Sequence, residues 1–460
     1  MMRILTGIAA VLLLVSATAA PARAETLADA LIAAYRNSNL LAQNQAVLRA
    51  ADEDAAVALA SLRPVAQFTA QGGWQRSESS GIFGGLSQSE GETGSIALSV
   101  DLVLWAGGRG LLGVEIARES VLATRQALVG IEQDVLLAAA SAYVDVRLQA
   151  EIVALRQSNV RLITQELRAA QDRFDVGEVT LTDVALARSR LAASQAGLAA
   201  AQGAFTVARE AYKAATGGYP GNLAGLPKLP ATAKTIEAAR VVALRSHPDV
   251  LRAQHESRVA DLRIKVAKGA YAPTIGANAT SGLNTVTGGE QTSVTLSYRH
   301  QLYQGGEVSA LYRRSLASKA AADALLHQVS VLVDQNLGQR WALLAVAQAS
   351  IEAGRLQVTA AQTAFDGVRE EATLGARTTL DVLNAEQELL SARATKLQAE
   401  ADRYVGTYQI LAAMGLLTAD HLQLGVPTYD PAAYYNAVKQ APLSSTQGKA
   451  LDRILGKIAN

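Results

Sequence analysis

The amino-acid sequence repeats itself once along most of its length, so any fold must accommodate two copies of the same unit. Pro64 aligns with Pro273 at an offset of 209 residues, whereas Gly177 aligns with Gly375 at an offset of 198. One length change of 11 residues (209 − 198) reconciles the two registers. A period of this size lies far above the roughly 20–50 residues of solenoid repeats. We therefore expect a tandem duplication of one large unit.

The duplication predicts five segments in the 460-residue chain. They are a signal peptide, 1–24; a first repeat, 25–217; a linker, 218–235; a second repeat, 236–415; and a C-terminal tail, 416–460. The linker contains repeated Gly and Pro, which interrupt helices and strands.

Residues 1–24 have the composition of a secretory signal peptide. Arg3 precedes an apolar run over residues 4–15, and residues 22–24 (Ala-Arg-Ala) form a small-residue cleavage site before Glu25. The apolar run is shorter than the ~20 residues that a transmembrane helix needs, and no later run reaches that length without charges. The mature protein is therefore expected to be periplasmic, secreted or an outer-membrane β-barrel.

Composition excludes several function classes. Lys and Arg (42) nearly balance Asp and Glu (41), which leaves no basic field for nucleic acid. The absence of Cys excludes disulfides, thiol catalysis and Cys-based zinc sites. A chain that is 50% hydrophobic but only 5% aromatic, with 10 Pro, is typical of long, closely packed helices.

Each repeat contains two segments in which apolar and polar residues alternate. Strands are predicted at 65–75 and 95–104 in the first repeat and at 273–283 and 291–302 in the second. A ten-residue strand with one apolar and one polar face is typical of a membrane barrel. A soluble hairpin packed on a helix would give the same alternation. Four strands cannot close a barrel, because membrane barrels begin at about eight, so several chains would have to share one.

The rest of each repeat is predicted to be helical, in the order helix, two strands, long helix, turn, helix. Residues 109–175 contain no Pro and carry two apolar stripes on nearly opposite sides, which favours a neighbouring helix on each flank. A bundle core could produce part of this pattern. Gly177 and Gly375 suit the left-handed end of a helix, and a Thr-x-x-Asp capping pattern follows each of them.

These two turns carry a recognisable motif. Residues 374–385 have the sequence LGARTTLDVLNA, and residues 176–184 have the sequence VGEVTLTDV. The first resembles the periplasmic-tip motif of the TolC-like outer-membrane factor family, and the second resembles its first-repeat counterpart. The resemblance extends over both repeats, roughly residues 25–425.

The resemblance implies an α+β, mostly α protomer that assembles into a homotrimer. Three chains would form a 12-stranded outer-membrane β-barrel continued by a long periplasmic α-helical barrel. It implies a passive exit duct with no cofactor and no enzymatic activity, located in outer-membrane lipid and extending into the periplasm. The expected partners are a periplasmic adaptor (membrane fusion protein) and an inner-membrane ABC or RND-type pump. The cargo would be a secreted protein, in type I secretion, or small molecules and drugs. The tail, with Tyr434 and Tyr435, resembles members that serve type I secretion.

The resemblance also implies a constriction at the periplasmic tip. Asp381 matches a family position at which aspartates of three chains form a ring. Asn384 stands one turn later, where the family often has a second Asp, so fewer charges are expected here. A plain helix cap is the alternative reading of Asp381, and it is the favoured reading of Asp183.

Further tip residues are assigned by the same resemblance. Arg377 matches a residue that latches the inner helix pair to the outer pair, here expected against Thr182 or Asp183. A solvated surface charge is the alternative for Arg377. Gly177 and Gly375 mark the tips that are expected to dock the adaptor.

Two rival functions remain to be weighed. An enzyme is disfavoured, because the five His show no metal-ligand spacing and no nucleophile elbow, P-loop or HExxH motif is present. A periplasmic coiled-coil scaffold or adaptor protein would explain the helices and the signal peptide. It would not explain two copies of an amphipathic strand pair.

Overall fold

A computed structural model of the chain describes residues 24–80, 86–441, 449 and 453. The predicted signal peptide therefore lies outside the described residues except for Ala24, and so does most of the tail after Ala441. The described chain is mostly helical, with a single small antiparallel sheet. This confirms the mostly α, α+β class expected from the sequence.

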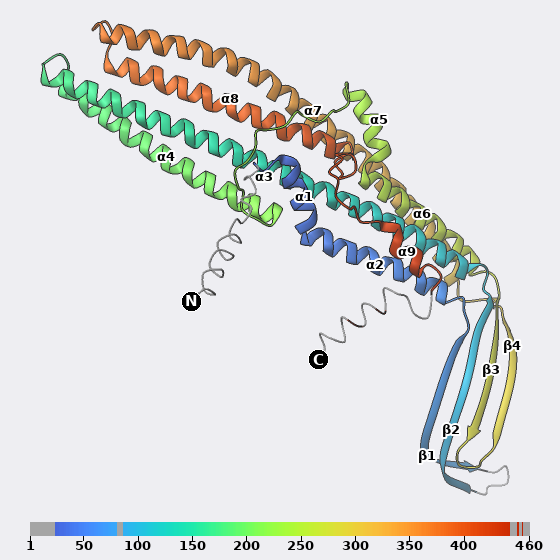
Figure 1. The fold of residues 1–460 in the computed structure, drawn as a ribbon. Helices are drawn as coiled ribbons and strands as arrows, with labels where there is room; N and C mark the ends of the chain where they lie inside the picture. The colour runs from blue at the N-terminus through green and yellow to red at the C-terminus, as the bar shows by residue number, and fades with distance from the viewer. Residues whose placement is uncertain (1–23, 81–85, 442–448, 450–452, 454–460) are drawn as a thin grey trace, which may run out of the picture. The chain divides into compact units, whose positions relative to one another are not determined.

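The same order of elements occurs twice (Figure 1). The first set is α1 (Leu27–Asn37), α2 (Asn39–Ala60), β1 (Val65–Ser80), β2 (Leu86–Trp105), α3 (Arg109–Asp175) and α4 (Leu181–Thr216). The second set is α5 (Ile236–Ser246), α6 (Pro248–Gly269), β3 (Thr274–Asn284), β4 (Glu290–Arg299), α7 (Glu307–Thr373) and α8 (Thr379–Ala413). A last helix, α9 (Pro431–Val438), lies in the C-terminal tail.

The four strands form one sheet in the order β1-β2-β3-β4, with every neighbouring pair antiparallel. The central pair, β2 with β3, joins the two repeats. β1 and β2 extend beyond the ranges expected from apolar alternation, because the ladder continues through polar residues from Gln75 opposite Gly91 to Ser80 opposite Leu86. Backbone hydrogen bonds need no apolar side chains, so the alternation of apolar and polar residues does not reveal the polar ends of these strands.

The first helical segment of each repeat is broken once. In the first repeat α1 ends at Asn37, because the next residue, Ser38, has an extended backbone with a ψ of 109°. In the second, His247 is extended and Pro248 begins α6. Proline suits the first position of a helix and disfavours helical backbone before it, which explains the second break.

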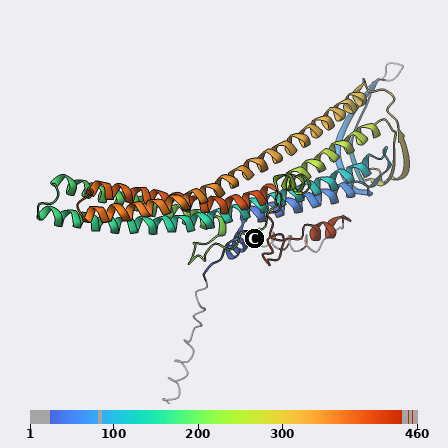
Figure 2. The same ribbon diagram turned by 90° about the horizontal axis from the view of Figure 1, so that it is seen from above.

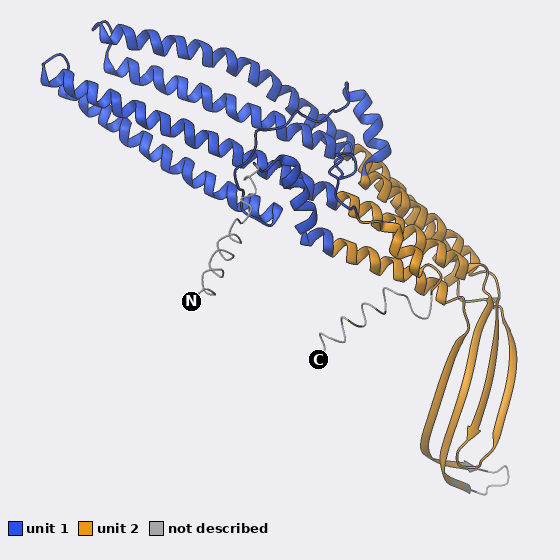
Figure 3. Ribbon diagram, in the orientation of Figure 1, with its two compact units in different colours: residues 1–42, 131–247, 333–428 blue, residues 43–130, 248–332, 429–460 orange. Residues whose placement is uncertain are grey.

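The described chain divides into two compact units (Figure 3). Unit 1 comprises residues 1–42, 131–247 and 333–428, and it is helical. Its largest fully buried side chains are Tyr143, Tyr212, Leu27, Leu136, Val144, Leu337, Leu383, Ile410, Leu411 and Leu417. Burying a leucine or isoleucine side chain stabilises a fold by roughly 1.5–3 kcal/mol, so these residues define the core of the unit.

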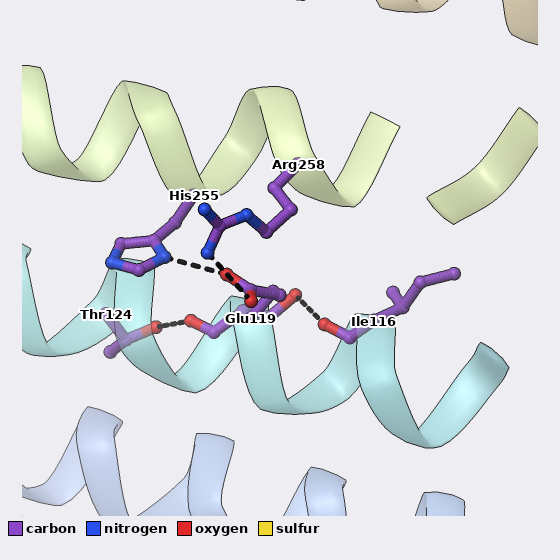
Figure 4. A network of polar contacts seen from close by, with 6 residues as sticks. Ile116, Glu119, Thr124, His255 and Arg258 are labelled. Atoms are coloured by element: carbon purple, nitrogen blue, oxygen red, sulfur yellow. Dashed lines mark hydrogen bonds and ion pairs between the residues drawn. The ribbon is translucent and has the colours of Figure 1, made fainter. Parts of the chain in front are cut away.

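Unit 2 comprises residues 43–130, 248–332 and 429–460 and contains the sheet. Its helices are joined by polar contacts, of which one set connects α3 with α6 (Figure 4). Glu119 of α3 makes two contacts with α6. Its Oε2 is hydrogen-bonded to His255 Nδ1 (2.7 Å), and its Oε1 forms an ion pair with Arg258 Nη1 (3.3 Å). Ser257 then donates to Asp323 of α7 at 2.7 Å, so α6 is fixed to both long helices.

The tail segment around α9 packs against α2 within unit 2. Tyr434 donates its hydroxyl to Glu53 Oε1 at 2.6 Å, and Arg63 donates to the carbonyl oxygen of Ala441 at 2.6 Å. Next to Glu53, Asp52 is completely buried, and neither carboxyl oxygen has a hydrogen-bond partner within the described residues. Burial raises the pKa of Asp52 to about 6, while Arg125 opposes the rise.

One described helix, α3, is long and apolar enough to cross a membrane by length and composition alone. The sequence predicts no run of this length without charged residues after the signal peptide. In this structure 44% of the apolar stretch is buried inside the protein, and a single helix of this kind is weak evidence for a membrane span.

Candidate functional site

The sheet has one apolar face that the protein leaves exposed. Phe68 of β1 lies opposite Leu98 of β2, and Leu296 of β4 lies opposite Ala277 of β3. Phe68, Leu98 and Leu296 are 67%, 54% and 72% exposed. A soluble hairpin would bury such a face against a helix, so the exposure requires another apolar environment.

The opposite face of the same sheet is polar. Ser99 faces Thr280, and Asp101 faces Asn278, whose Nδ2 donates to Asp101 Oδ1 at 2.7 Å. Thr280 in turn donates to Asn278 Oδ1 at 3.0 Å. An apolar face on one side and a hydrogen-bonded polar face on the other is the arrangement of a barrel wall between lipid and water.

Both edges of the sheet are also open. In the described chain β1 and β4 are edge strands, each paired on one side alone. Edge strands expose unpaired backbone groups and are normally covered or paired in a stable protein. In a hydrocarbon environment every backbone polar group must be paired, so a sheet placed there would need a partner strand at each of these two edges.

The second feature is the pair of turns that end the two long helical hairpins of unit 1. In both views the α3–α4 and α7–α8 hairpins lie side by side in this unit (Figures 1 and 2). Gly177 and Gly375 have φ angles of +82° and +78° at these turns. Only glycine adopts this left-handed backbone without strain, which explains its presence at both predicted tips.

A capping box follows each turn, with nearly the same geometry in both. Thr180 accepts from Asp183 N at 3.3 Å and donates its own N–H to Asp183 Oδ2 at 2.9 Å. Thr378 and Asp381 repeat these bonds at 3.3 and 3.0 Å. The hydrogen bonds from threonine lower the pKa of both aspartates, because they stabilise the ionised carboxylate. Both aspartates therefore act as caps within the chain.

The charged residues at the two tips pair within their own turns. Arg377 Nε contacts Glu371 Oε2 at 2.8 Å, and Arg173 Nε contacts Glu178 Oε2 at 3.2 Å. Within the described residues no hydrogen bond or ion pair joins Arg377 to Thr182 or Asp183. The expected latch between Arg377 and Thr182 or Asp183 is therefore not among the contacts of the described residues, and it stays a prediction.

Asn384 has a partner that sequence reasoning missed. Arg190 of α4 donates from Nη2 to Asn384 Oδ1 at 3.1 Å. The two residues are 194 positions apart, and no local motif indicates the pairing. The contact connects the first helical hairpin to the helix that carries Asp381.

Two further contacts between the hairpins were also missed. Asn159 of α3 donates to the buried Glu386 of α8, and Arg369 of α7 pairs with Glu166 of α3 at 3.4 Å. Apolar packing supports them, since Leu383 of α8 is 1% exposed within a cluster of α3 and α4 side chains. The helix that bears Asp381 and Asn384 is therefore fixed against the first hairpin. The part of the chain that the structure describes contains no group of three or more His, Asp or Glu side chains suited to a metal ion.

Comparison with known proteins identifies the family. The outer membrane efflux protein family matches residues 31–218 and again 240–416. The chain is 35% identical over 428 residues to the outer membrane efflux protein BepC of Brucella suis biovar 1, and the alignment covers 92% of each chain. It is 25% identical to the alkaline protease secretion protein AprF of Pseudomonas aeruginosa, over 64% of this chain and 63% of AprF.

The fold agrees with this assignment. The crystal structure of the outer membrane protein VceC from Vibrio cholerae superposes with a TM-score of 0.74 at 18% identity, covering 85% of this chain and 96% of VceC. The resemblance to TolC-like outer-membrane factors is confirmed, and the periplasmic scaffold is not favoured. The chain belongs to the outer membrane efflux protein family, a family of transport proteins, and it is an outer-membrane exit duct for efflux or type I secretion.

Proposed function

We propose that the protein works as a homotrimer in which three four-stranded sheets close into one 12-stranded outer-membrane barrel. The observation that carries this proposal is the open sheet with its exposed apolar face. Closure by neighbouring copies pairs both edges, places the apolar face in lipid and leaves the polar face around a water-filled lumen. The helices of the three chains continue the duct as a periplasmic α-helical barrel.

At the periplasmic end, Asp381 and Asn384 of the three chains line the constriction. Carboxylates that converge on one axis attract cations and repel one another. Arg190 brings a positive charge to Asn384 in each chain. The constriction therefore selects cations less strongly than it would with an aspartate at both positions. Arg377 latches the inner helix pair to the outer pair, against Thr182 or Asp183, when its ion pair with Glu371 exchanges. The turns at Gly177 and Gly375 present the tips to a periplasmic adaptor.

The duct conducts its cargo passively, and an adaptor with an inner-membrane ABC or RND-type pump supplies the energy. The relatives include both an efflux protein and a protease secretion protein, which supports the two cargo classes equally. Residues 1–24 act as a signal peptide that is cleaved on export. Cleavage leaves Glu25 as the first residue, where its N–H donates to the Asn222 carbonyl at 2.8 Å and so ties the new terminus to the linker.

The first test is the native mass of the protein after extraction from carbonate-washed outer membranes in mild detergent, corrected for bound detergent. A mass of three mature chains supports the shared barrel. A monomer, or release of the protein by the carbonate wash, contradicts it and returns the scaffold to consideration.

A matched pair of variants tests which face meets lipid. Leu296→Arg places a charge on the apolar face of β4, whereas Thr295→Arg places it on the polar face one residue away. A lipid-facing arginine near the membrane centre costs about 2–4 kcal/mol per chain, so Leu296→Arg should reduce the yield of membrane-inserted trimer. Thr295→Arg should insert normally. Equal yields would contradict the proposed orientation of the sheet.

A further inference from the structure

We infer that Glu386 is a positioning residue for the constriction: its buried side chain holds α8 against α3 while it carries a proton, and it loosens this contact when it ionises. This inference rests on the proposed function, because α8 also carries Asp381 and Asn384. Glu386 itself contacts no cargo and acts through the helix that bears those residues.

The side chain lies in an apolar seam between helices. Glu386 is 4% exposed, and Leu383 and Leu389 on the same helix are 1% and 5% exposed. Its Oε1 accepts from the amide of Asn159, which is itself 8% exposed on α3. Within the described residues its Oε2 has no hydrogen-bond partner. A buried carboxylate with one oxygen unsatisfied is costly, whereas a neutral carboxylic acid is far less so.

The charged groups around the seam do not compensate an ionised Glu386. Glu166 on α3 is acidic, and its ion pair is with Arg369 of α7 at 3.4 Å. Arg190 of α4 is engaged one turn away with Asn384. Burial is the main cause that raises the pKa of Glu386 to about 7 from an ordinary value of 4.5; Asn159 opposes the rise and Glu166 adds to it.

The direction of the pH effect follows from this raised pKa. When α8 leaves α3, Glu386 meets water and its pKa falls toward the ordinary value. The docked state thus binds the proton more tightly, so docking is strongest in acid, weakens as the pH rises from about 4.5 and is weakest above about 7. Each pKa unit is a tenfold change, so the full effect on the docking equilibrium is on the order of 10²-fold per chain.

The duplication indicates that the fold does not require an acid at this position. At the offset of 198, Glu386 corresponds to Arg188 of α4, which is exposed. A leucine would fill the same seam, and replacing buried ionisable groups with apolar ones is often neutral or stabilising. The carboxyl therefore adds a response to protons at the one helix that lines the constriction.

The experiment records single-channel conductance of the full trimer in planar bilayers between pH 5.5 and 8.5. It compares the native protein with Glu386→Gln and Glu386→Leu, which are both permanently neutral. The matched control is Glu388→Gln, which alters an exposed glutamate on the same helix. We expect the conductance of the native protein and of the control to rise as the pH approaches 7 and to level off above it. The two neutral variants should keep the low conductance of acid pH throughout.

Hydrogen exchange of the backbone amides of residues 379–392, corrected for the intrinsic pH dependence of exchange, gives a second readout in detergent. Protection should fall as the pH rises toward 7 in the native protein, level off above 7, and stay high in Glu386→Gln. A native trimer that conducts without a pH step, or neutral variants that retain the step, would overturn the inference and leave the channel proposal intact. Failure to form a trimer at all would instead refute the channel proposal.

Discussion

Asn37 donates its side-chain amide to the main-chain carbonyl of Thr216 at 2.7 Å, across 179 residues. The second repeat contains the equivalent bond, from Ser246 Oγ to the carbonyl of Met414 at 2.8 Å. The donors are separated by the offset of 209 (246 − 37) and the acceptors by 198 (414 − 216). In both repeats a polar side chain at the end of the short first helix thus satisfies a carbonyl at the end of the last helix.

The glycines beside these bonds predict an order of stability. Gly217 and Gly415 have φ angles of +88° and +75°. A Cβ at Gly415 would lie 2.5 Å from the main-chain oxygen of Ser246, whereas one at Gly217 would first meet the side chain of Asn37 at 2.9 Å. The left-handed backbone alone costs an alanine roughly 1–2 kcal/mol. Gly415→Ala should therefore lower the thermal unfolding midpoint by circular dichroism more than Gly217→Ala does. Gly203→Ala, inside α4 with open space around it, should leave the midpoint unchanged or raise it slightly.

The two capping boxes have the same hydrogen bonds, so comparing them can show whether Asp381 only caps its helix or also lines the constriction. Asp381→Ala and Asp183→Ala each remove the N3 carboxylate of a capping box and leave the N-cap threonine in place, which costs about 0.3–1 kcal/mol. If Asp381 also lines the constriction, its loss should weaken block by multivalent cations at least tenfold in bilayer recordings, since a tenfold change needs only about 1.4 kcal/mol. Asp183→Ala should leave the block unchanged. The same block in both variants would reduce Asp381 to a cap.

The tip arginines form a second matched pair. Arg377→Ser and Arg173→Ser each break an exposed ion pair within a turn, and such pairs contribute about 0–1 kcal/mol. The proposed latch predicts that Arg377→Ser raises the resting conductance of the channel and Arg173→Ser does not. If the two variants conduct alike, Arg377 is a surface charge.

Asp52 predicts a pH dependence for the tail. Burial is the main cause that raises the pKa values of Tyr429 and Tyr434 in the tail segment, and the charge of the nearby Asp52 adds to the rise. Burial also raises the pKa of Asp52 itself to about 6 from 3.8. Because burial beneath the tail favours the protonated form, the tail should dock most tightly in acid and less tightly as the pH rises through 6. Asp52→Asn should slow proteolytic cleavage within residues 429–441 at pH 8, severalfold and by up to ~10²-fold. At pH 5 cleavage of the variant should approach that of the native protein. A variant that is cleaved faster at pH 8 would show that the carboxylate instead supports docking.

The features that sequence predicts well here are local ones. Gly177 requires a backbone conformation that its own residue type permits, and Thr180 and Asp183 are three residues apart, so turn and cap follow from spacing alone. Contacts between distant segments were not predictable. Asn159 and Glu386 are 227 residues apart, and a glutamate on a helix is usually solvated, so nothing in its neighbours marks it as buried.

The pairing of β2 with β3 was likewise out of reach, although each strand was expected. Alternation identifies the faces of a strand and leaves its neighbours undetermined. The polar ends of β1 and β2 show the same limit, because their pairing depends on main-chain groups that the side chains do not reveal.

The two open edges of the sheet have a consequence for the life of the newly made chain. In the proposed trimer, copies of the chain cover these edges, so a single chain that has not yet assembled exposes unpaired strand backbone and an apolar sheet face to water. Such a species aggregates unless a holding chaperone masks it or its encounters are fast. If the chain assembles as proposed, a subunit that meets no copies is prone to aggregate, and the yield of the duct depends on how quickly subunits associate.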